Sequence, residues 1–323
     1  MELWLLYAIL GSVFAGVTAV LAKIGIKGVN SHLATAVRTS VVVVFSWIIV
    51  LIVGSHLEIV SVSGRTWAFL IASGLATGAS WLCFFYALKF GTVSNVSPLK
   101  KSSTVLTIIL AFIILGDPLG LPQILGMVFI IAGTVIMLEK EKGAEPHLNE
   151  KSGNWLLEFF GNRLERAKMS RNQGAFSHAG TSFRRTLVFG MLAAVFASLV
   201  TIFGALGVAD IDADLGNAIR VLVVLIASWG LVLFTGNQKG ISSISKKSWV
   251  FLLLSGLATG GSWLFFFRAL QTGPVSAIVP IDKLSIIFNI LFAAVFLKEK
   301  QSLKRVAGLA CLVIGTLVLV MMY

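Results

Sequence analysis

Ten runs of predominantly apolar residues dominate this sequence, and each is about as long as the roughly 20 residues that a helix needs to cross a bilayer. In the first half of the chain the runs fall at residues 3–22, 32–53, 67–88, 94–115 and 121–138. In the second half they fall at residues 186–207, 214–235, 249–270, 276–297 and 303–322. Most connectors are short, so consecutive helices are expected to pack antiparallel. We predict an all-α membrane protein with ten transmembrane helices.

The composition supports a lipid environment. Charged residues make up 12% of the 323 residues, against about 25% in an ordinary soluble domain, so the polar coat of a soluble protein is missing. The net charge of +12 does not indicate nucleic-acid binding, because the basic residues lie mostly between the apolar runs. Cys83 and Cys311 lie inside such runs, which argues against a disulfide framework or a zinc site. The start of the chain lacks the basic region of a signal peptide, so the first run is expected to remain a permanent span.

The two halves of the chain are copies of one another. Shifted by 182 residues, the sequence matches itself without a gap from its first residue to about residue 141. Ser-Gly-Leu-Ala-Thr-Gly at 73–78 recurs at 255–260, and Ser80-Trp81-Leu82 recurs as Ser262-Trp263-Leu264. The residues that keep register include Arg38 with Arg220, Trp47 with Trp229, Trp67 with Trp249, Pro98 with Pro280 and Gly133 with Gly315. Accidental similarity between apolar helices would not preserve these residue types.

The repeat divides the chain into residues 1–141, a linker at 142–182, and residues 183–323. Each copy holds five runs, and because five is an odd number the second copy must enter the membrane from the opposite side. This is the inverted-repeat plan of secondary transporters. We therefore predict two inverted five-helix repeats joined by the linker.

Basic residues are distributed unevenly between the two sides of the predicted membrane. The side that holds both termini carries Arg65 alone, whereas the linker, connectors and run ends of the other side carry nineteen basic residues. The positive-inside rule then places the linker in the cytoplasm and both termini outside the cell (inner) membrane. Within the linker, residues 154–170 have the spacing of an amphipathic helix, which lies either on an anionic leaflet or as a cap over the helix ends.

An ordered set of short motifs occurs in both copies. In the first copy they are Phe14-Ala15-Gly16, Lys23-Ile24-Gly25, Ala36-Val37-Arg38, the stretch from Gly74 to Leu88, Gly91-Thr92-Val93-Ser94 and Leu115-Gly116-Asp117. The second copy has Arg220, the stretch from Gly256 to Leu270, Gly273-Pro274-Val275-Ser276 and Leu297-Lys298-Glu299. This set resembles the EamA family of the drug/metabolite transporter superfamily over both five-helix units. The resemblance implies a carrier or exporter of small metabolites, amino acids among them. Two-copy members are usually drawn with both termini in the cytoplasm, whereas the charge count here places them outside.

Charged side chains inside a span are costly and mark candidate sites. Those inside the predicted spans are Arg38, Lys100, Lys101, Arg220, Arg268, Asp282 and Lys283. The spans 94–115 and 276–297 are the strongest candidates, because Pro98 and Pro280 cannot donate to the carbonyls of Ser94 and Ser276. Lys100-Lys101 and Asp282-Lys283 follow these prolines, and inverted symmetry brings both pairs toward the midplane. The alternative is that the prolines start these helices and the lysines snorkel to the interface.

The roles of these residues stay open at this level. Asp282 either takes up a proton, contacts a substrate amine, or pairs structurally with Lys100 or Lys101 across the repeat interface. Arg38 and Arg220 either bind a carboxylate or phosphate or snorkel, and Arg268 is a weak candidate at a helix end. Trp81 and Trp263, near mid-span, either line a cavity or pack in the core. The spacing of Gly74 with Gly78, repeated at 256 and 260, indicates close helix packing.

These patterns predict a carrier that moves a small polar metabolite, amino-acid-like or an organic anion, by alternating access, with or without proton coupling. Six bases against one acid within the spans favour a substrate with a carboxylate or phosphate. The alternatives are a flippase for an anionic polyisoprenoid or phospholipid, and a non-transporting membrane scaffold. We expect no enzyme activity, cofactor, metal site or nucleic-acid partner, because metal-ligand spacings, nucleophile motifs and phosphate loops are missing. The chain would work either as a monomer or as a homodimer.

Overall fold

The computed structural model describes residues 2–26, 29–90, 96, 99–100, 102–137, 178–285, 287 and 303–320, and every regular element in these ranges is a helix. The first half contains α1 (Leu3–Gly25), α2 (Ser31–Val53), η1 (Ser55–Val60), α3 (Gly64–Phe90), α5 (Ser103–Leu110), η2 (Ala111–Leu115) and α6 (Leu121–Met137). The second half contains α8 (His178–Gly207), α9 (Ala213–Phe234), η3 (Asn237–Ser243), α10 (Lys246–Thr272), α11 (Val275–Lys283) and α13 (Leu303–Val320).

Six of the described helices are long and apolar enough to span a bilayer. The spanning stretches are Leu3–Ala22, Ser31–Val53, Gly64–Phe84, Arg184–Gly207, Ala213–Phe234 and Lys246–Thr272, and shorter apolar helices lie at Ser103–Leu115, Leu121–Ile136 and Val306–Leu319. The prediction of an all-α, multi-pass protein is therefore confirmed. The count of ten spans stays a prediction, because most of 276–297 and the start of 94–115 lie outside the described residues. The linker with its predicted helix at 154–170 also lies outside them.

Equivalent helices of the two repeats begin and end with equivalent residues. Asn30 and Asp212, which are equivalent positions, cap α2 and α9, and each side chain accepts from the backbone N–H groups two and three residues later. Such a cap satisfies N–H groups that have no partner within the helix, which matters most where water is scarce. Gly54 and Gly236 end the same two helices with left-handed φ values of 85° and 68°. Both copies thus begin and end these helices with the same local chemistry.

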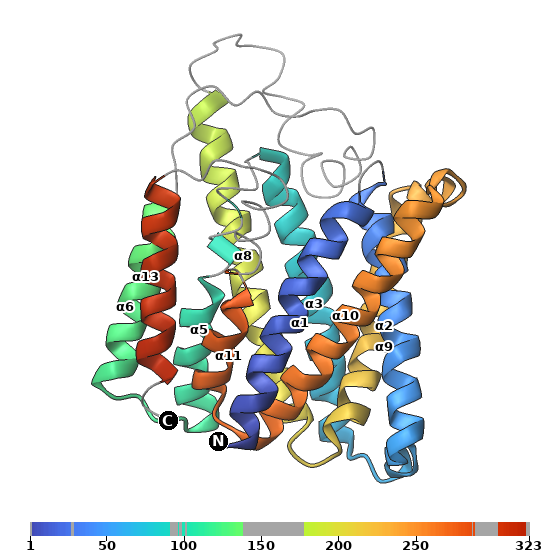
Figure 1. Cartoon of the computed structure of the whole chain (residues 1–323), viewed down its shortest axis with the longest axis horizontal. Helices are drawn as coiled ribbons and strands as arrows, with labels where there is room; N and C mark the ends of the chain where they lie inside the picture. Colours follow the sequence, from blue (N-terminus) through green and yellow to red (C-terminus); the bar gives the residue numbers. More distant parts are fainter. Residues whose placement is uncertain are drawn as a thin grey trace.

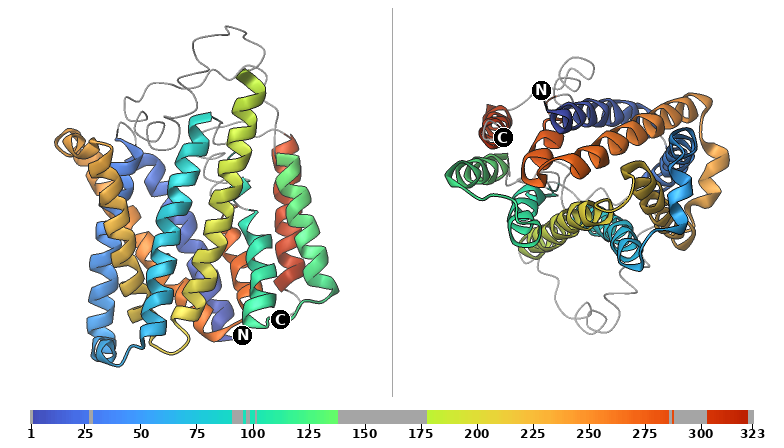
Figure 2. Two further views of the ribbon diagram at one scale, coloured as in Figure 1. Left: turned by 180° about the vertical axis from the view of Figure 1, so that it is seen from behind. Right: turned by 90° about the horizontal axis from the view of Figure 1, so that it is seen from below.

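Equivalent helices of the two halves run in opposite directions. Helix α1 begins and α13 ends at one end of the bundle, which we name the termini end, whereas α8 begins at the other end (Figure 1). Helix α3 packs most extensively against α8, and its counterpart α10 packs against α1. Helices α6 and α13 form a pair at one edge of the bundle (Figure 2). The main interfaces therefore join one repeat to the other.

Glycine residues allow the helices to approach each other closely at these interfaces. A Cβ atom added to Gly74 of α3 would lie 2.6 Å from Cβ of Val223 on α9, and one added to Gly256 of α10 would lie 2.6 Å from Cβ of Val41 on α2. Lipid tails are as apolar as these helices, so close van der Waals packing, rather than exclusion of water, drives their association. The glycine spacing thus packs helices as the sequence predicts.

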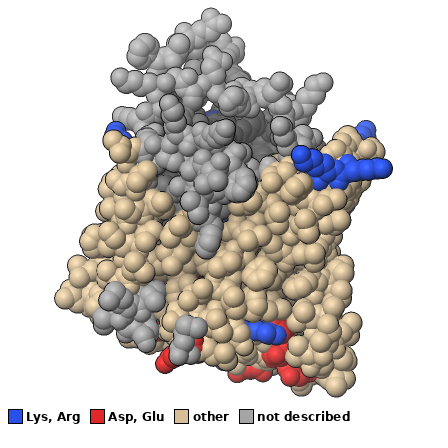
Figure 3. All heavy atoms as spheres, in the orientation of Figure 1, with Lys and Arg blue, Asp and Glu red and all other residues tan. Residues whose placement is uncertain are grey.

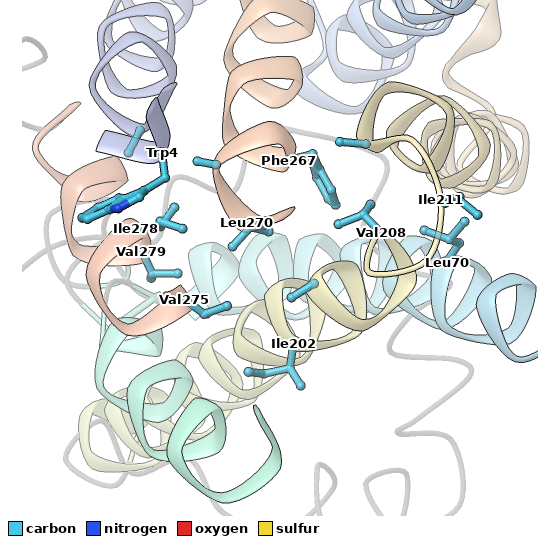
Figure 4. Packing of buried hydrophobic residues seen from close by; sticks show 14 of the residues in the cluster. Trp4, Leu70, Ile202, Val208, Ile211, Phe267, Leu270, Val275, Ile278 and Val279 are labelled. Carbon is cyan, nitrogen blue, oxygen red and sulfur yellow. The ribbon is translucent and has the colours of Figure 1, made fainter. Parts of the chain in front are cut away.

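The largest cluster of buried apolar side chains lies toward the termini end. It joins Trp4 of α1, Leu70 of α3, Phe267 and Leu270 of α10 and Ile278 of α11 (Figure 4). Val208 and Ile211, which lie at the connection from α8 to α9, complete it from the side. Side chains from four helices and from the connection between α8 and α9 therefore fill this end of the bundle in the state described.

Candidate substrate site

Arg220 of α9 is the largest fully buried side chain near the middle of the bundle, with 2% of its surface exposed. Its Nη1 donates to Oγ1 of Thr77 on α3 at 3.1 Å. The guanidinium carbon lies 4.5 Å from the ring centroid of Trp263 and 4.7 Å from that of Phe267, both on α10. This burial excludes the snorkelling alternative for Arg220, because the charged group is turned into the protein.

Arg38, the equivalent residue in the first repeat, makes the equivalent bond. Its Nη2 donates to Oγ1 of Thr259 on α10 at 2.9 Å, and Thr259 is the counterpart of Thr77. Arg38 is only partly buried. The Nε atoms of both arginines are buried without a hydrogen-bond partner. Within the described ranges, neither guanidinium takes part in an ion pair.

Serine side chains also form hydrogen bonds between the two repeats, and each of these bonds has an equivalent in which the repeats are exchanged. Ser73 Oγ on α3 donates to the carbonyl of Val200 at 2.8 Å, and its counterpart Ser255 donates to the carbonyl of Thr18 at 3.1 Å. The next pair, Ser80 with Ala193 and Ser262 with Gly11, has a distance of 2.9 Å in both copies. A hydroxyl that bonds a carbonyl of another helix satisfies both groups without water, as polar side chains do between membrane helices. The two repeats are thus bonded to each other by matching contacts.

The tryptophans of the repeat have different surroundings. Trp263 faces Arg220 and packs beside a small cluster formed by Val42, Val43 and Val221. Trp81 is partly buried, and no ring contact with Arg38 is found among the described residues. Among the described residues, therefore, only the arginine of the second repeat packs against aromatic rings.

Of the predicted pairs Lys100-Lys101 and Asp282-Lys283, the structure describes every residue except Lys101. Lys283 Nζ donates to Oδ2 of Asp282, its neighbour in sequence, at 2.8 Å, with 32% and 22% of the two side chains exposed. Lys100 lies with its Nζ 4.8 Å from the ring centroid of Phe84. Among the described residues Asp282 is paired with its neighbour Lys283 and not with Lys100, while Lys101, the other partner considered across the repeat interface, lies outside them.

Helix α11 begins beside a carboxylate of the first repeat. The backbone N–H of Ser276 donates to Oδ2 of Asp117 at 2.8 Å, so the negative charge lies at the positive end of the helix dipole. Pro280 lies inside α11, where it removes one backbone N–H donor. Three predicted site residues of the first copy, Ser94, Pro98 and Lys101, lie outside the described residues.

An ion pair that the sequence did not indicate lies near the termini end. Arg268 Nε donates to Oδ1 of Asp214 at 3.0 Å and Nη2 to Oδ2 at 2.5 Å, with Asp214 buried to 3% exposure. One turn further along α10, Gln271 Nε2 donates to the carbonyls of Val208 and Ile211. The repeat gave no signal for this contact, because the counterparts of Asp214 and Arg268 are His32 and Tyr86.

Charge is separated along the bundle. On the face shown in Figure 3 the exposed acidic side chains gather at the termini end, while most of the exposed basic ones lie at the other. Glu58 and Asp210 are exposed at the first, and Lys239, Lys246 and Lys247 at the second. Within the part of the chain that the structure describes, no group of three or more His, Cys, Asp or Glu is placed to hold a metal ion.

Long apolar helices, buried charge and cross-repeat hydrogen bonds define a multi-pass helical membrane protein with an internal repeat. The chain belongs to the EamA-like transporter family, whose model matches it twice, over residues 2–139 and 184–321. The resemblance inferred from the motifs is thereby confirmed, and the protein is a membrane transporter by family. A transporter family also favours the expectation that the chain is not an enzyme.

Relatives and a solved structure agree with this assignment. The chain is 44% identical over 134 residues to an uncharacterized transporter in the cobO 3' region of Sinorhizobium sp, a match that covers 42% of this chain and 95% of that protein. It is 28% identical over 141 residues to the uncharacterized transporter YxxF of Bacillus subtilis (strain 168), covering 43% of each chain. A crystal structure described only as that of a protein superposes with a TM-score of 0.71 at 15% identity, covering 99% of this chain and 97% of that one. That likeness shows the fold alone.

Proposed function

We propose that the protein is a secondary carrier that moves a small polar metabolite, amino-acid-like or an organic anion, by alternating access. The observation that carries this proposal is the set of hydrogen bonds that occurs twice with the repeats exchanged. Arg38 with Thr259 and Arg220 with Thr77 are one such pair of bonds. Two inverted units with the same contacts have two equivalent ways to pack, and each closes a different end of the bundle.

The state described supports one half of this cycle. The buried cluster around Phe267 and Leu270 fills the termini end, and Arg268 with Asp214 fastens α10 to α9 there. In the opposite state the equivalent segments of the first repeat would close the other end, and the cluster at the termini end would separate. Such rocking of one repeat against the other is how inverted-repeat carriers expose one site to two sides.

The charges of the described residues favour an anionic group on the substrate. Arg38 and Arg220 carry positive charge among the helices without an ion pair in the described ranges, and the Lys100 ammonium lies on an aromatic ring. Uncompensated buried charge is costly, so its retention is typical of ligand sites. Asp282 would contact a substrate amine or take up a proton, which requires that Lys283 release it during the cycle.

The orientation of the protein is part of the proposal. Both termini would lie outside the cell (inner) membrane, with residues 142–182 as a cytoplasmic linker between repeat 1–141 and repeat 183–323. The basic side chains exposed at the end opposite the termini support this, because positive charge is retained on the cytoplasmic side.

One observation favours lipid handling as a second candidate. A groove of about 630 Å³ lies between α1, α2 and α10, lined almost entirely by apolar side chains such as Phe14, Phe45 and Leu257, with Arg268 among its lining residues. A groove of this kind between membrane helices would accept the chain of an amphiphile. A flippase for an anionic polyisoprenoid or phospholipid is therefore the alternative to be tested beside the carrier.

The test compares cells that overexpress the protein, cells that lack it, and cells that express Asp282→Asn. Small solutes are measured by mass spectrometry in cells and in medium, and lipids of both leaflets are measured in parallel. We expect a solute carrying a carboxylate or phosphate to move between the compartments only with the active protein. Asp282→Asn should abolish this movement while the protein stays in the membrane, whereas Asp210→Asn, at an exposed acid, is the matched control. An altered lipid distribution without a solute change would favour the flippase, and no change in either would contradict both.

A further inference from the structure

The guanidinium of Arg220 has one free edge. The rings of Trp263 and Phe267 lie against it, with centroids 4.5 and 4.7 Å from the guanidinium carbon, and Nη1 is bonded to Thr77. The N–H of Nε and the nearer N–H of Nη2 point in parallel from one side of the planar group. Nε is buried without an acceptor. Two parallel N–H groups at this spacing match the two oxygens of a carboxylate.

The surroundings hold this edge in a fixed direction. Thr77 Oγ1 donates to the carbonyl of Ser73 at 2.9 Å, so its lone pairs are directed toward the arginine. The aromatic rings pack against the guanidinium and replace water that would otherwise solvate it. With 2% of Arg220 exposed, an oxyanion that reaches this edge would meet a desolvated charge, where attraction is stronger than in water.

Arg38 differs from Arg220 in the surroundings of its guanidinium group. Its bond to Thr259 uses Nη2, on the same side of the group as Nε, and the side chain is only partly buried, whereas Arg220 is bonded through Nη1 and is 2% exposed. Among the described residues no ring lies against the Arg38 guanidinium. The repeat therefore conserves the bond to threonine in both copies, but among the described residues only the second arginine is both buried and packed against aromatic rings.

We infer that the Nε–Nη2 edge of Arg220 is the subsite that binds the carboxylate of the transported solute. Thr77, Trp263 and Phe267 hold the guanidinium in place for it. This inference rests on the proposed carrier function and adds the chemical group that is recognised and the residue that recognises it. Arg38 is assigned the role of a tether between the repeats, because it is only partly buried and, among the described residues, lacks the rings that would hold its guanidinium in place.

The test uses the full chain reconstituted in liposomes, with and without an imposed proton gradient. One set of vesicles receives an equimolar mixture of the twenty proteinogenic amino acids with pyruvate, succinate and citrate. A second set receives the corresponding carboxamides, in which each carboxylate is replaced by a neutral group of similar shape. The contents are identified by mass spectrometry. We expect the unaltered protein to take up at least one acid and to take up its amide at least about tenfold more slowly, because a bidentate ion pair contributes about this factor or more.

Three substitutions of arginine by lysine complete the design, since lysine keeps the positive charge but cannot donate two parallel hydrogen bonds to a carboxylate. Arg220→Lys should lower uptake of the acid about tenfold, Arg38→Lys clearly less, and Arg65→Lys, at an exposed residue, not at all. Each variant is checked by size-exclusion chromatography, and the acid–amide comparison needs no variant at all. No uptake of any solute would overturn the carrier function itself. Uptake of acid and amide at equal rates, or equal losses in Arg220→Lys and Arg38→Lys, would overturn the subsite while the carrier remains.

Discussion

Replacing Asp214 by asparagine tests whether the ion pair with Arg268 fastens the termini end of the bundle. The carboxylate is 3% exposed and accepts two bonds from the guanidinium, at 3.0 and 2.5 Å. Hydrogen bonds to charged groups contribute about 1.5–3 kcal/mol each, but 30% of the Arg268 side chain is exposed and solvent screens part of the pair. Asparagine retains one acceptor and loses the charge. We expect Asp214→Asn to lower the free energy of unfolding by about 2–3 kcal/mol.

The assay is equilibrium unfolding of the purified protein in mixed micelles by titration with sodium dodecyl sulfate, followed by loss of helix signal. Asp210→Asn is the matched control, because Asp210 lies on the connector just before α9 and is exposed, and it should change stability by less than about 0.5 kcal/mol. A cycle with Arg268→Gln should give a coupling energy of about 1–3 kcal/mol for Asp214 and Arg268. If the two asparagine variants were equally stable, or if the coupling energy were zero, the ion pair would not be what fastens α10 to α9.

Three further predictions concern helix packing and caps. Gly74→Ala should destabilise the protein by about 1–3 kcal/mol in the same titration, because the new methyl would lie 2.6 Å from Val223 Cβ, whereas Gly230→Ala, with open space around it, should be neutral or slightly stabilising. Ser262→Ala should cost about 0.5–1.5 kcal/mol for the lost bond to a carbonyl of α1, and a change in thermal stability within error would contradict this. Asp117→Asn should weaken the start of α11 at Ser276, which hydrogen exchange of the amides after Pro274 would detect as faster exchange.

Much of the fold follows from local pattern. The long apolar runs predict the helices α1, α2, α3, α8, α9 and α10 to within a few residues for most of their ends, since a helix in lipid satisfies its own backbone groups whatever its neighbours are. Self-comparison of the sequence also finds the duplication, which the family match over residues 2–139 and 184–321 agrees with. Both signals are read along one chain and need no knowledge of which helices touch.

The sequence predicted several residues of the candidate site, but it did not predict which residues they contact. Arg38, Arg220 and Trp263 stand out in the sequence as charge and aromatic side chains at repeated positions. That Arg220 lies against Trp263 and Phe267 could not be read from it, because Arg220 is on α9 and both rings are on α10. Sequence spacing likewise gave no reason to join Asp214 to Arg268, since their counterparts in the first copy, His32 and Tyr86, are not a carboxylate and a guanidinium.

The sequence by itself determined that this chain is a helical, internally duplicated membrane protein with positive charge inside its spans. Composition, run length and repeat suffice for that, because each reflects the contact of single helices with lipid. Only the tertiary structure decided that α3 packs on α8 and α10 on α1, so that the threonine bonded to each arginine comes from the other repeat. The physical reason is that lipid and helix surfaces are equally apolar. Hydropathy therefore does not record which face meets a neighbour, and glycine contacts and buried hydrogen bonds select the partner instead.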